Sequence, residues 1–309
     1  MTYLAQLKPW LLTVLLAVSL SGCSALSVKE QLDHSQLTKA GFTQSELHLA
    51  EGGELRYWVG GQGKPLVMLH GFGGTATTTW LPMMLELSQH YTIIAPDLAW
   101  FGDSFSQGTA NITTQRAAVN QLLSQLRVEH CSLVGISYGG LVAYDMMANQ
   151  QGIDKAVILA SPGTFISDQN LAELSQRFDR DHPADIFVPE NRQQMRHLFE
   201  GVFTRFPPLP HAIDEQIYQR YFAQWQEQKR KLIDSLPSYR DQLAPQVDPK
   251  LMPPTLLVWG ENDRVFPLEQ GKQLSRYLDA PMVVIPEAPH NISNEHPATV
   301  SQAIELFIQ

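Results

Sequence analysis

The stretch Gly135-Ile136-Ser137-Tyr138-Gly139 sets the interpretation of the whole chain. It follows the apolar run Cys131-Ser132-Leu133-Val134 and precedes a second apolar segment that begins at Leu141. This order predicts a strand, a sharp turn with the serine at its apex, and a helix. The flanking glycines let strand and helix approach more closely than side chains would permit. We therefore expect a serine hydroxyl beside the free N–H groups of a helix start, where an oxyanion can bind.

Taken alone, this pattern also fits an ordinary glycine-rich turn. A nucleophilic serine needs a histidine as its base, and the histidine needs a carboxylate to orient it. Two later segments supply candidates: Asp263 follows a predicted strand at 255–260, and His290 follows a predicted strand at 281–286. Parallel sheets place ligands at the carboxyl ends of their strands, so we expect both side chains at one edge of the sheet.

Three further motifs accompany the serine turn. They are His70-Gly71-Phe72-Gly73-Gly74, Pro96-Asp97-Leu98 with Phe101-Gly102-Asp103-Ser104, and Trp259-Gly260-Glu261-Asn262-Asp263. With these motifs, the chain from Ser45 to its last residue resembles the α/β-hydrolase superfamily. Within it, the chain is most similar to monomeric bacterial lipases and esterases. It also resembles hydrolases that cleave C–C bonds in ring-fission products.

The resemblance implies roles for five residues. Ser137 is the implied nucleophile, His290 the general base, and Asp263 the acid that orients the base. The backbone N–H groups of Phe72 and Tyr138 are the implied oxyanion hole. The implied reaction is hydrolysis of a carboxylic ester, from a small molecule or a lipid, through an acyl-enzyme.

Other ionisable residues near these motifs have simpler interpretations. Asp97 and Asp103 precede the serine in the chain, and we expect them to brace loops through side-chain hydrogen bonds. Glu261 lies two residues from Asp263 and is expected to face away. His70 is expected to be a structural hydrogen-bonding residue.

Short apolar runs without alternation predict central parallel strands covered on both faces. They occupy about 66–69, 91–95, 132–134 and 156–159, and helical segments lie between them. This succession predicts an α/β fold. With the resemblance, the expected architecture is the α/β-hydrolase fold, a mostly parallel eight-stranded sheet flanked by helices with an inserted helical cap.

The succession of strands and helices stops after residue 164 and resumes near residue 251. We therefore assign 45–164 and 251–309 to the core and 165–250 to the cap. Four cap aromatics, Tyr218, Tyr221, Phe222 and Trp225, are candidates either for lining an acyl pocket or for packing the cap onto the core. In the core, Trp100 stands where the family commonly has glycine, and we expect its ring near the active-site entrance.

The N-terminus carries a secretion pattern. Lys8 precedes an apolar run at 10–18 that is too short to span a membrane. Leu20-Ser21-Gly22-Cys23 resembles the bacterial lipobox, which implies cleavage before Cys23 and lipidation there. Residues 1–22 are then a signal peptide and 23–44 a polar tether. The following Ser24 favours the outer membrane of the bacterial cell envelope. A plain secretory signal or an uncleaved anchor stays the alternative.

Composition narrows the functional classes. The 309 residues suffice for one α/β domain with a cap, and the formal net charge is −9. An acidic chain without a basic cluster is not expected to bind nucleic acid. Cys23 and Cys131 are the only cysteines, and no cluster of cysteines and histidines has metal-ligand spacing. No dinucleotide motif follows the first strand, so we expect no such cofactor. We further expect a monomer without cofactor or metal.

Two alternatives to an ester hydrolase stay open at this point. One is a C–C bond hydrolase of ring-fission products, although such substrates normally arise in the cytoplasm. The other is a non-catalytic lipoprotein that uses the fold as a scaffold.

Overall fold

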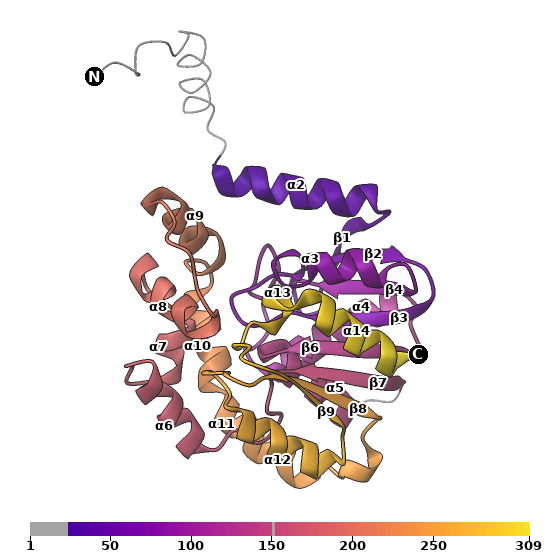
Figure 1. Ribbon diagram of the computed structural model, residues 1–309. Coiled ribbons are helices and arrows are strands. Elements are labelled where there is room, and N and C mark those ends of the chain that lie inside the picture. Colours follow the sequence, from indigo (N-terminus) through magenta and orange to yellow (C-terminus); the bar gives the residue numbers. More distant parts are fainter. Residues whose placement is uncertain (1–23, 150–151) are drawn as a thin grey trace, which may run out of the picture.

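The computed structural model describes residues 24–149 and 152–309. Its strands are β1 (Thr43–His48), β2 (Gly53–Gly61), β3 (Lys64–Leu69), β4 (Tyr91–Pro96), β5 (Phe105–Ser106), β6 (Cys131–Ile136), β7 (Ile153–Leu159), β8 (Thr255–Gly260) and β9 (Met282–Ile285). Eight of them form one sheet in the order β1-β2-β4-β3-β6-β7-β8-β9, and β5 pairs with β2. Pairing is parallel from β4 to β9 and antiparallel at β1 and β2. The predicted, mostly parallel sheet is confirmed, with the two-residue β5 as an addition (Figure 1).

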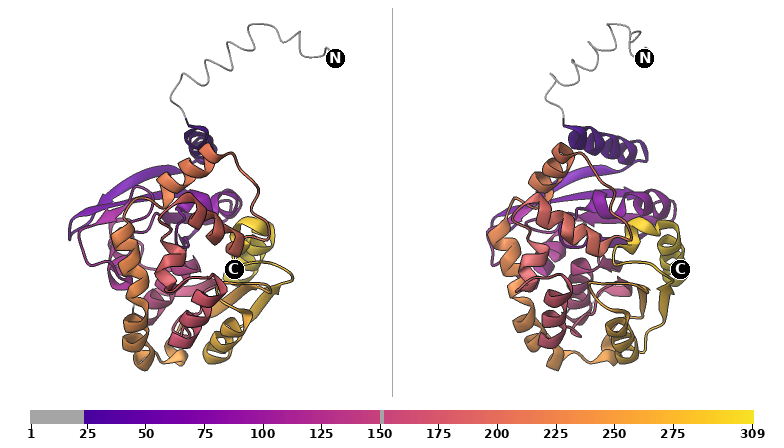
Figure 2. Two further views of the ribbon diagram at one scale, coloured as in Figure 1. Left: turned by 90° about the vertical axis from the view of Figure 1, so that its left-hand side faces the viewer. Right: turned by 60° about the vertical axis from the view of Figure 1, so that its left-hand side comes forward.

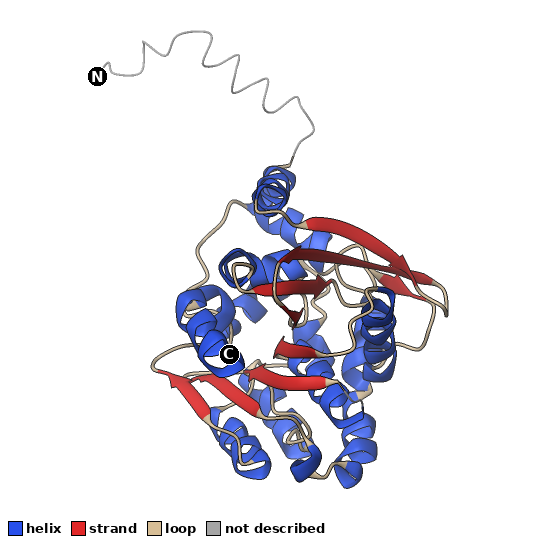
Figure 3. Ribbon diagram, turned by 90° about the vertical axis from the view of Figure 1, so that its right-hand side faces the viewer, coloured by secondary structure: helices blue, strands red, loops and turns tan. Residues whose placement is uncertain are grey.

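Helices cover both faces of this sheet (Figure 3). They are α3 (Ala76–Leu87), α4 (Ile112–Gln125), α5 (Tyr138–Asn149), α12 (Leu268–Leu278), α13 (Ile292–Glu295) and α14 (Pro297–Ile308). Strand β3 shows why both faces are apolar: Leu66 and Met68 pack with α3 and α14, while Val67 and Leu69 pack with α4 and α5. All four side chains are fully buried, and each such burial contributes about 1.5–3 kcal/mol. The unalternating runs of the sequence are therefore strands covered on both sides.

The segment between β7 and β8 is helical. It contains α6 (Asp168–Arg177), α7 (Pro183–Phe187), α8 (Arg192–Val202), α9 (His211–Tyr221), α10 (Gln226–Asp234) and α11 (Leu236–Leu243), followed by the short 3₁₀ helices η1 (Ala244–Gln246) and η2 (Pro249–Leu251). Its helices α6 to α10 lie together on one side of the sheet (Figure 1). Phe178, Met195 and Phe222 form an apolar cluster there with Trp259 and Phe266 of the core. The inserted segment is thus packed onto the core through its own apolar cluster.

Most of the described residues of the expected tether, 24–44, form a helix instead. Ala25–Lys39 form helix α2, which begins at Ser24, whose side chain accepts a hydrogen bond from Ser27 N at 3.0 Å. The side chain of Leu37 is fully buried in the cluster that contains Trp58 and Trp80. The tether prediction failed because α2 has no apolar stripe, the feature from which an amphipathic helix is predicted. One leucine, placed by the tertiary structure, anchors its second half.

The predicted signal peptide (1–22) and the predicted lipidation site, Cys23, lie outside the described residues. In the part of the chain that the structure describes, no helix has the length and apolar character needed to cross a membrane.

Candidate active site

Ser137 occupies the turn between β6 and α5, and its backbone has a φ of 53°. Its N–H donates to Leu159 O of β7 at 2.9 Å, and its carbonyl accepts from Leu141 N at 3.1 Å. A Cβ on Gly139 would collide with the carbonyl oxygens of Leu69 and His70. The glycine is therefore required by a close approach of α5 to β3, and this approach holds the serine in a left-handed conformation that costs a non-glycine residue free energy.

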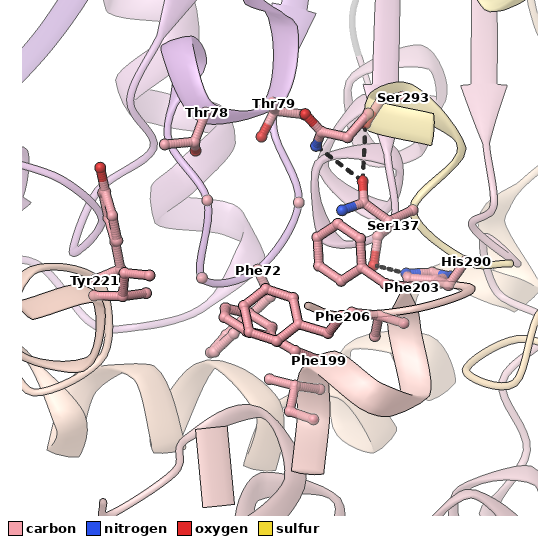
Figure 4. Close-up of a pocket in the computed structure, with 18 of the residues that line it drawn as sticks. Phe72, Thr78, Thr79, Ser137, Phe199, Phe203, Phe206, Tyr221, His290 and Ser293 are labelled. Carbon is pink, nitrogen blue, oxygen red and sulfur yellow. Dashed lines mark hydrogen bonds between the residues drawn. The ribbon is translucent and has the colours of Figure 1, made fainter. Parts of the chain in front are cut away.

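Asp263 and His290 follow β8 and β9, the last two strands of the sheet. Asp263 follows β8, and its Oδ1 accepts from the backbone N–H groups of Val265 at 2.8 Å and Phe266 at 2.9 Å. His290 follows β9, and its Nδ1 lies 2.8 Å from Asp263 Oδ2. Its Nε2 lies 2.9 Å from Ser137 Oγ (Figure 4). All three side chains are buried, so the structure brings the predicted nucleophile, base and acid into one hydrogen-bonded chain.

The carboxylate fixes the tautomer of this histidine. An ionised Asp263 only accepts hydrogen bonds, so Nδ1 of His290 carries the proton and donates it. In the neutral ring, Nε2 is then an acceptor that faces the hydroxyl of Ser137. This is the arrangement in which a histidine can remove the serine proton.

Two backbone N–H groups next to the serine have no acceptor. They belong to Phe72, in the loop after β3, and to Tyr138, the first residue of α5. Among the described residues, no hydrogen bond of either group is found. Gly71 lies against the serine, since a Cβ on it would be 3.4 Å from Ser137 Cβ. The two predicted oxyanion-hole donors are thus next to the serine and unpaired.

A cavity of about 360 Å³ opens above Ser137 and His290. It is lined by the loop after β3, by α3, by the loop after β9 and by the cap. Its apolar wall contains Phe199 and Phe203, which Figure 4 shows between the serine and Tyr221. The volume lies within the range of about 300–1,000 Å³ that is typical of small-molecule sites. The cavity therefore suits an apolar ligand with its reacting group at the serine.

The cap aromatics divide into two groups. Tyr221 and Phe222 line the cavity, as one of the two interpretations expected. Tyr218 instead donates its hydroxyl to Glu190 O at 2.6 Å, and Trp225 stacks on Phe105 with ring centroids 5.6 Å apart. Sequence reasoning missed three cavity residues that precede and enter the proline-rich stretch, namely Phe199, Phe203 and Phe206. Their spacing gave no helical signal, because only Phe199 lies on α8, which ends at Val202.

Trp100 is not at the entrance. Its side chain is 1% exposed, and its indole N–H donates to Ser106 O at 3.1 Å. The backbone of Trp100 has a φ of 68°, which explains why glycine is common at this position in the family. The side-chain amide of Gln115 binds the backbone of the preceding Ala99 twice. Its oxygen accepts from Ala99 N, and its nitrogen donates to Ala99 O, both at 2.9 Å. The ring is therefore turned into the core rather than toward the cavity.

A small recess also reaches Ser137. It has a volume of about 20 Å³ and is lined by apolar side chains of α5 and the cap, among them Leu141, Ile166 and Leu236. The two spaces share Phe72 and Phe187. A substrate bound at the serine therefore meets one large and one small apolar space.

The remaining polar residues brace the loops around the site. His70 Nδ1 donates to Gly71 O at 2.8 Å, and its Nε2 accepts from Leu98 N at 2.9 Å. Burial lowers the pKa of His70 to about 4, so the ring is neutral and structural, as expected.

Neither Asp97 nor Asp103 contacts the histidine of the site. Asp97 accepts from Ala76 N at 2.7 Å at the start of α3, and burial raises the pKa of its carboxyl to about 7. Asp103 pairs with Arg220 of the cap at 2.7 Å. Glu261 is exposed and accepts from Glu287 N at 2.9 Å. Asp97 thus braces a loop, as expected, whereas Asp103 joins its loop to the cap instead.

Comparison with known proteins gives a single family. The model of the alpha/beta hydrolase family matches residues 66–303. The chain belongs to the alpha/beta hydrolase family. It is 31% identical over 260 residues to an uncharacterized hydrolase, YugF, of Bacillus subtilis, with 79% of this chain and 89% of the relative covered.

Two further relatives illustrate the chemistry of this family. This alpha/beta hydrolase is 26% identical to a 2-hydroxy-6-oxo-6-(2'-aminophenyl)hexa-2,4-dienoic acid hydrolase of Metapseudomonas resinovorans, covering 84% of this chain and 89% of that one. Among solved structures it is similar to a membrane phospholipase A described as a bacterial virulence factor. The TM-score is 0.78 at 25% identity, and 97% of this chain and 98% of the other are covered. The protein is therefore a hydrolase of the α/β fold, and its relatives include lipases, a dienoic acid hydrolase and an epoxide hydrolase.

Proposed function

We propose that this alpha/beta hydrolase cleaves carboxylic esters through an acyl-enzyme, with Ser137 as nucleophile, His290 as general base and Asp263 as its orienting acid. The observation that carries the proposal is the hydrogen-bonded chain of these three side chains at the floor of an apolar cavity. The geometry meets the requirements of a nucleophile within reach of a base that is itself oriented by an acid.

The proposed reaction has two halves. Ser137 Oγ attacks the ester carbonyl carbon while His290 Nε2 takes the hydroxyl proton, and the oxyanion binds the N–H groups of Phe72 and Tyr138. The tetrahedral intermediate expels the alcohol, which receives the proton from His290. Water then attacks the acyl-enzyme, gives one proton to His290, and releases the carboxylic acid and the free serine. Two preorganised N–H donors of this kind are each worth about 10²–10³ in kcat.

The cavity favours an ester over a ring-fission product. Ring-fission products of the type named for the relative are dienoic acids, whose carboxylate needs a cationic partner once it is buried. Among the described residues that line the cavity, Lys29 is the only lysine or arginine. That residue belongs to α2, and its side chain is 63% exposed and paired with Asp33. An uncharged ester with an apolar chain fits this lining better.

We also propose a lipid ester as the substrate class and a lipid anchor at Cys23. The phospholipase relative and the phenylalanine-rich cavity support the first part. The second rests on Leu20-Ser21-Gly22-Cys23 and the apolar run before it. An anchor of several acyl chains would hold the enzyme firmly at a membrane of the cell envelope. Ser24, the residue after the cysteine, favours the outer membrane.

A fluorophosphonate probe tests this proposal directly. It should label Ser137 covalently in the detergent-solubilised protein, and Ser137→Ala should abolish labelling. A parallel assay with p-nitrophenyl esters from acetate to palmitate should show turnover that the probe inhibits. An unlabelled serine in folded protein would favour the scaffold interpretation. Labelling without ester turnover, combined with cleavage of a dienoic ring-fission product, would favour the C–C hydrolase.

A further inference from the structure

Helix α2 forms part of the cavity wall. Leu26 and Lys29 line the cavity together with Tyr221 of α9. The backbone N–H of Leu26 donates a hydrogen bond to Gln216 Oε1 of α9 at 3.2 Å. Figure 2 shows α2 lying against α9 in both views, and Figure 4 places Tyr221 on the opposite side of the cavity from Ser137 and His290. The end of the cavity that is remote from the serine is thus bordered by a helix from outside the cap.

One carboxylate joins α2 to the cap. Glu30 Oε1 accepts from Arg220 Nε at 2.8 Å and from the hydroxyl of Tyr221 at 2.9 Å. The other nitrogens of Arg220 donate to Asp103 of the core at 2.7 and 3.1 Å. The Glu30–Arg220–Asp103 contact therefore connects α2, the cap and the core at the remote end of the cavity.

Few buried residues hold the first half of α2. The buried residues of the helix, Asp33 and Leu37, both lie in its second half. Leu26 and Lys29 precede them, and the side chain of Lys29 is largely exposed. Because few apolar contacts hold the first half, loss of the Glu30 contact should let it move away from α9 while Leu37 keeps the second half in place.

We infer that α2 is the end wall of the acyl-chain cavity and that the Glu30–Arg220 contact, with Leu26, sets the longest chain that the site accepts. This inference rests on the proposed ester hydrolysis. An apolar chain gains affinity with each methylene that finds room, by about fourfold. Once the chain reaches the wall, further methylenes meet packed side chains and the gain ends.

Two substitutions test the wall from opposite sides. In Glu30→Ala, kcat/KM for acetate and butyrate esters should stay unchanged, while the chain length at which kcat/KM stops rising moves to longer chains. Each newly accommodated methylene should add about fourfold. Leu26→Trp should shift the maximum to shorter chains. Glu269→Ala is the matched control, because it removes a Glu–Arg pair, to Arg276, on α12 outside the cavity lining.

A binding assay separates this inference from the proposed function. In a Ser137→Ala background, free fatty acids of increasing length compete with a fluorescent fatty acid, with and without Glu30→Ala. Improved binding of long chains in Glu30→Ala supports the wall even if no ester is hydrolysed. An unchanged chain-length profile in both Glu30→Ala and Leu26→Trp, in folded protein, overturns it. A uniform loss across all chain lengths in Glu30→Ala also overturns it, since that result would mean general damage to the cap.

Discussion

His290 Nε2 lies 2.9 Å from Ser137 Oγ, although the two residues are 153 positions apart in the chain. The serine follows β6 and the histidine follows β9, and β7 and β8 lie between these strands in the sheet. Asp263, which follows β8, completes the arrangement. Three loops that leave the same edge of a parallel sheet are thus held within hydrogen-bonding distance, and this relationship gives the most direct prediction.

Ser137→Ala and His290→Ala should each lower kcat for ester hydrolysis by about 10⁶, and the double variant should be little worse than either. The effects are not additive because the two side chains act as one unit. Steady-state kinetics, with circular dichroism as the folding control, measure this. A double variant that multiplies the two losses would contradict a shared role.

Asp263→Asn should fold and yet lose about 10⁴ in kcat. The oxygen of the amide can still accept from the N–H groups of Val265 and Phe266, which turns its NH₂ toward His290 Nδ1. That ring nitrogen must then accept, so Nε2 carries the proton and cannot act as a base. Near-normal turnover in this variant would transfer the acid role elsewhere, and Glu261→Gln would be measured next.

Phe203→Ala should flatten the rise of kcat/KM from acetate to medium-chain esters. Phe203 lines the cavity, and burial of each methylene against such a wall is worth about 0.8 kcal/mol. Trp225→Ala is the control, since this cap aromatic lies outside the cavity lining. A chain-length profile that responds to Trp225→Ala but not to Phe203→Ala would place the acyl chain elsewhere.

Asp97→Asn should change how stability depends on pH. The folded-state pKa of Asp97, raised to about 7 by burial, exceeds its unfolded value, so folded protein keeps a proton that the unfolded chain releases. Stability from this group is therefore present below about pH 4 and is lost as the pH rises to about 7. The asparagine keeps an acceptor for Ala76 N and does not titrate.

Over this pH range, the free energy of unfolding of Asp97→Asn relative to wild type should increase by up to about 4 kcal/mol and then stay constant. Urea denaturation between pH 4 and 8 measures the difference. His70, whose pKa burial lowers to about 4, has the opposite slope below its usual range, but it is present in both proteins and cancels. A pH-independent difference would show that Asp97 is ionised in the folded state throughout.

Gly139→Ala should destabilise the protein by more than about 3 kcal/mol and abolish activity. The added Cβ meets the carbonyl oxygens of Leu69 and His70 at the end of β3, so backbone rather than a flexible side chain would have to move. Gly41→Ala is the comparison, because a Cβ there meets no atom within 4 Å and only its positive φ is unfavourable. Thermal unfolding of the two variants distinguishes steric overlap from simple backbone strain.

Cys23→Ser should release the protein from membranes or leave its signal peptide uncleaved, because the thiol that would carry the lipid is absent. Fractionation of cells and mass spectrometry of the N-terminus measure both effects. An unmodified N-terminus at another position would contradict the proposed anchor. The Cys131→Ser variant is a suitable control, since Cys131 is buried in the core.

Much of the fold and of the candidate site was predictable, for a local reason. A short apolar run predicts a buried parallel strand, and the residues that follow it lie at the carboxyl edge of the sheet. Ser137, Asp263 and His290 each follow such a run. Gly139 likewise indicates the close approach of α5 and β3, because a side chain there would collide with the strand. Strand order and turn chemistry therefore bring the three side chains together without knowledge of the cap.

The cavity was only partly predictable, because its wall depends on which surfaces face one another. Trp100 has the type and the loop of an entrance residue, but a left-handed backbone turns it into the core. Tyr221 and Trp225 are four residues apart in the sequence, yet one lines the cavity and the other stacks on Phe105. Neither orientation is encoded in residue type or spacing.

The sequence by itself determined the sheet, the inserted helical segment and the three candidate residues of the site, because each corresponds to a short local sequence pattern. Only the tertiary structure decided that α2 is a helix and part of the cavity. Its contacts through Glu30 and Leu37 reach Arg220 and the cluster around Trp58, far away in the chain. A helix without an apolar stripe is stabilised by partners of this kind, and such partners become visible only when the chain has folded.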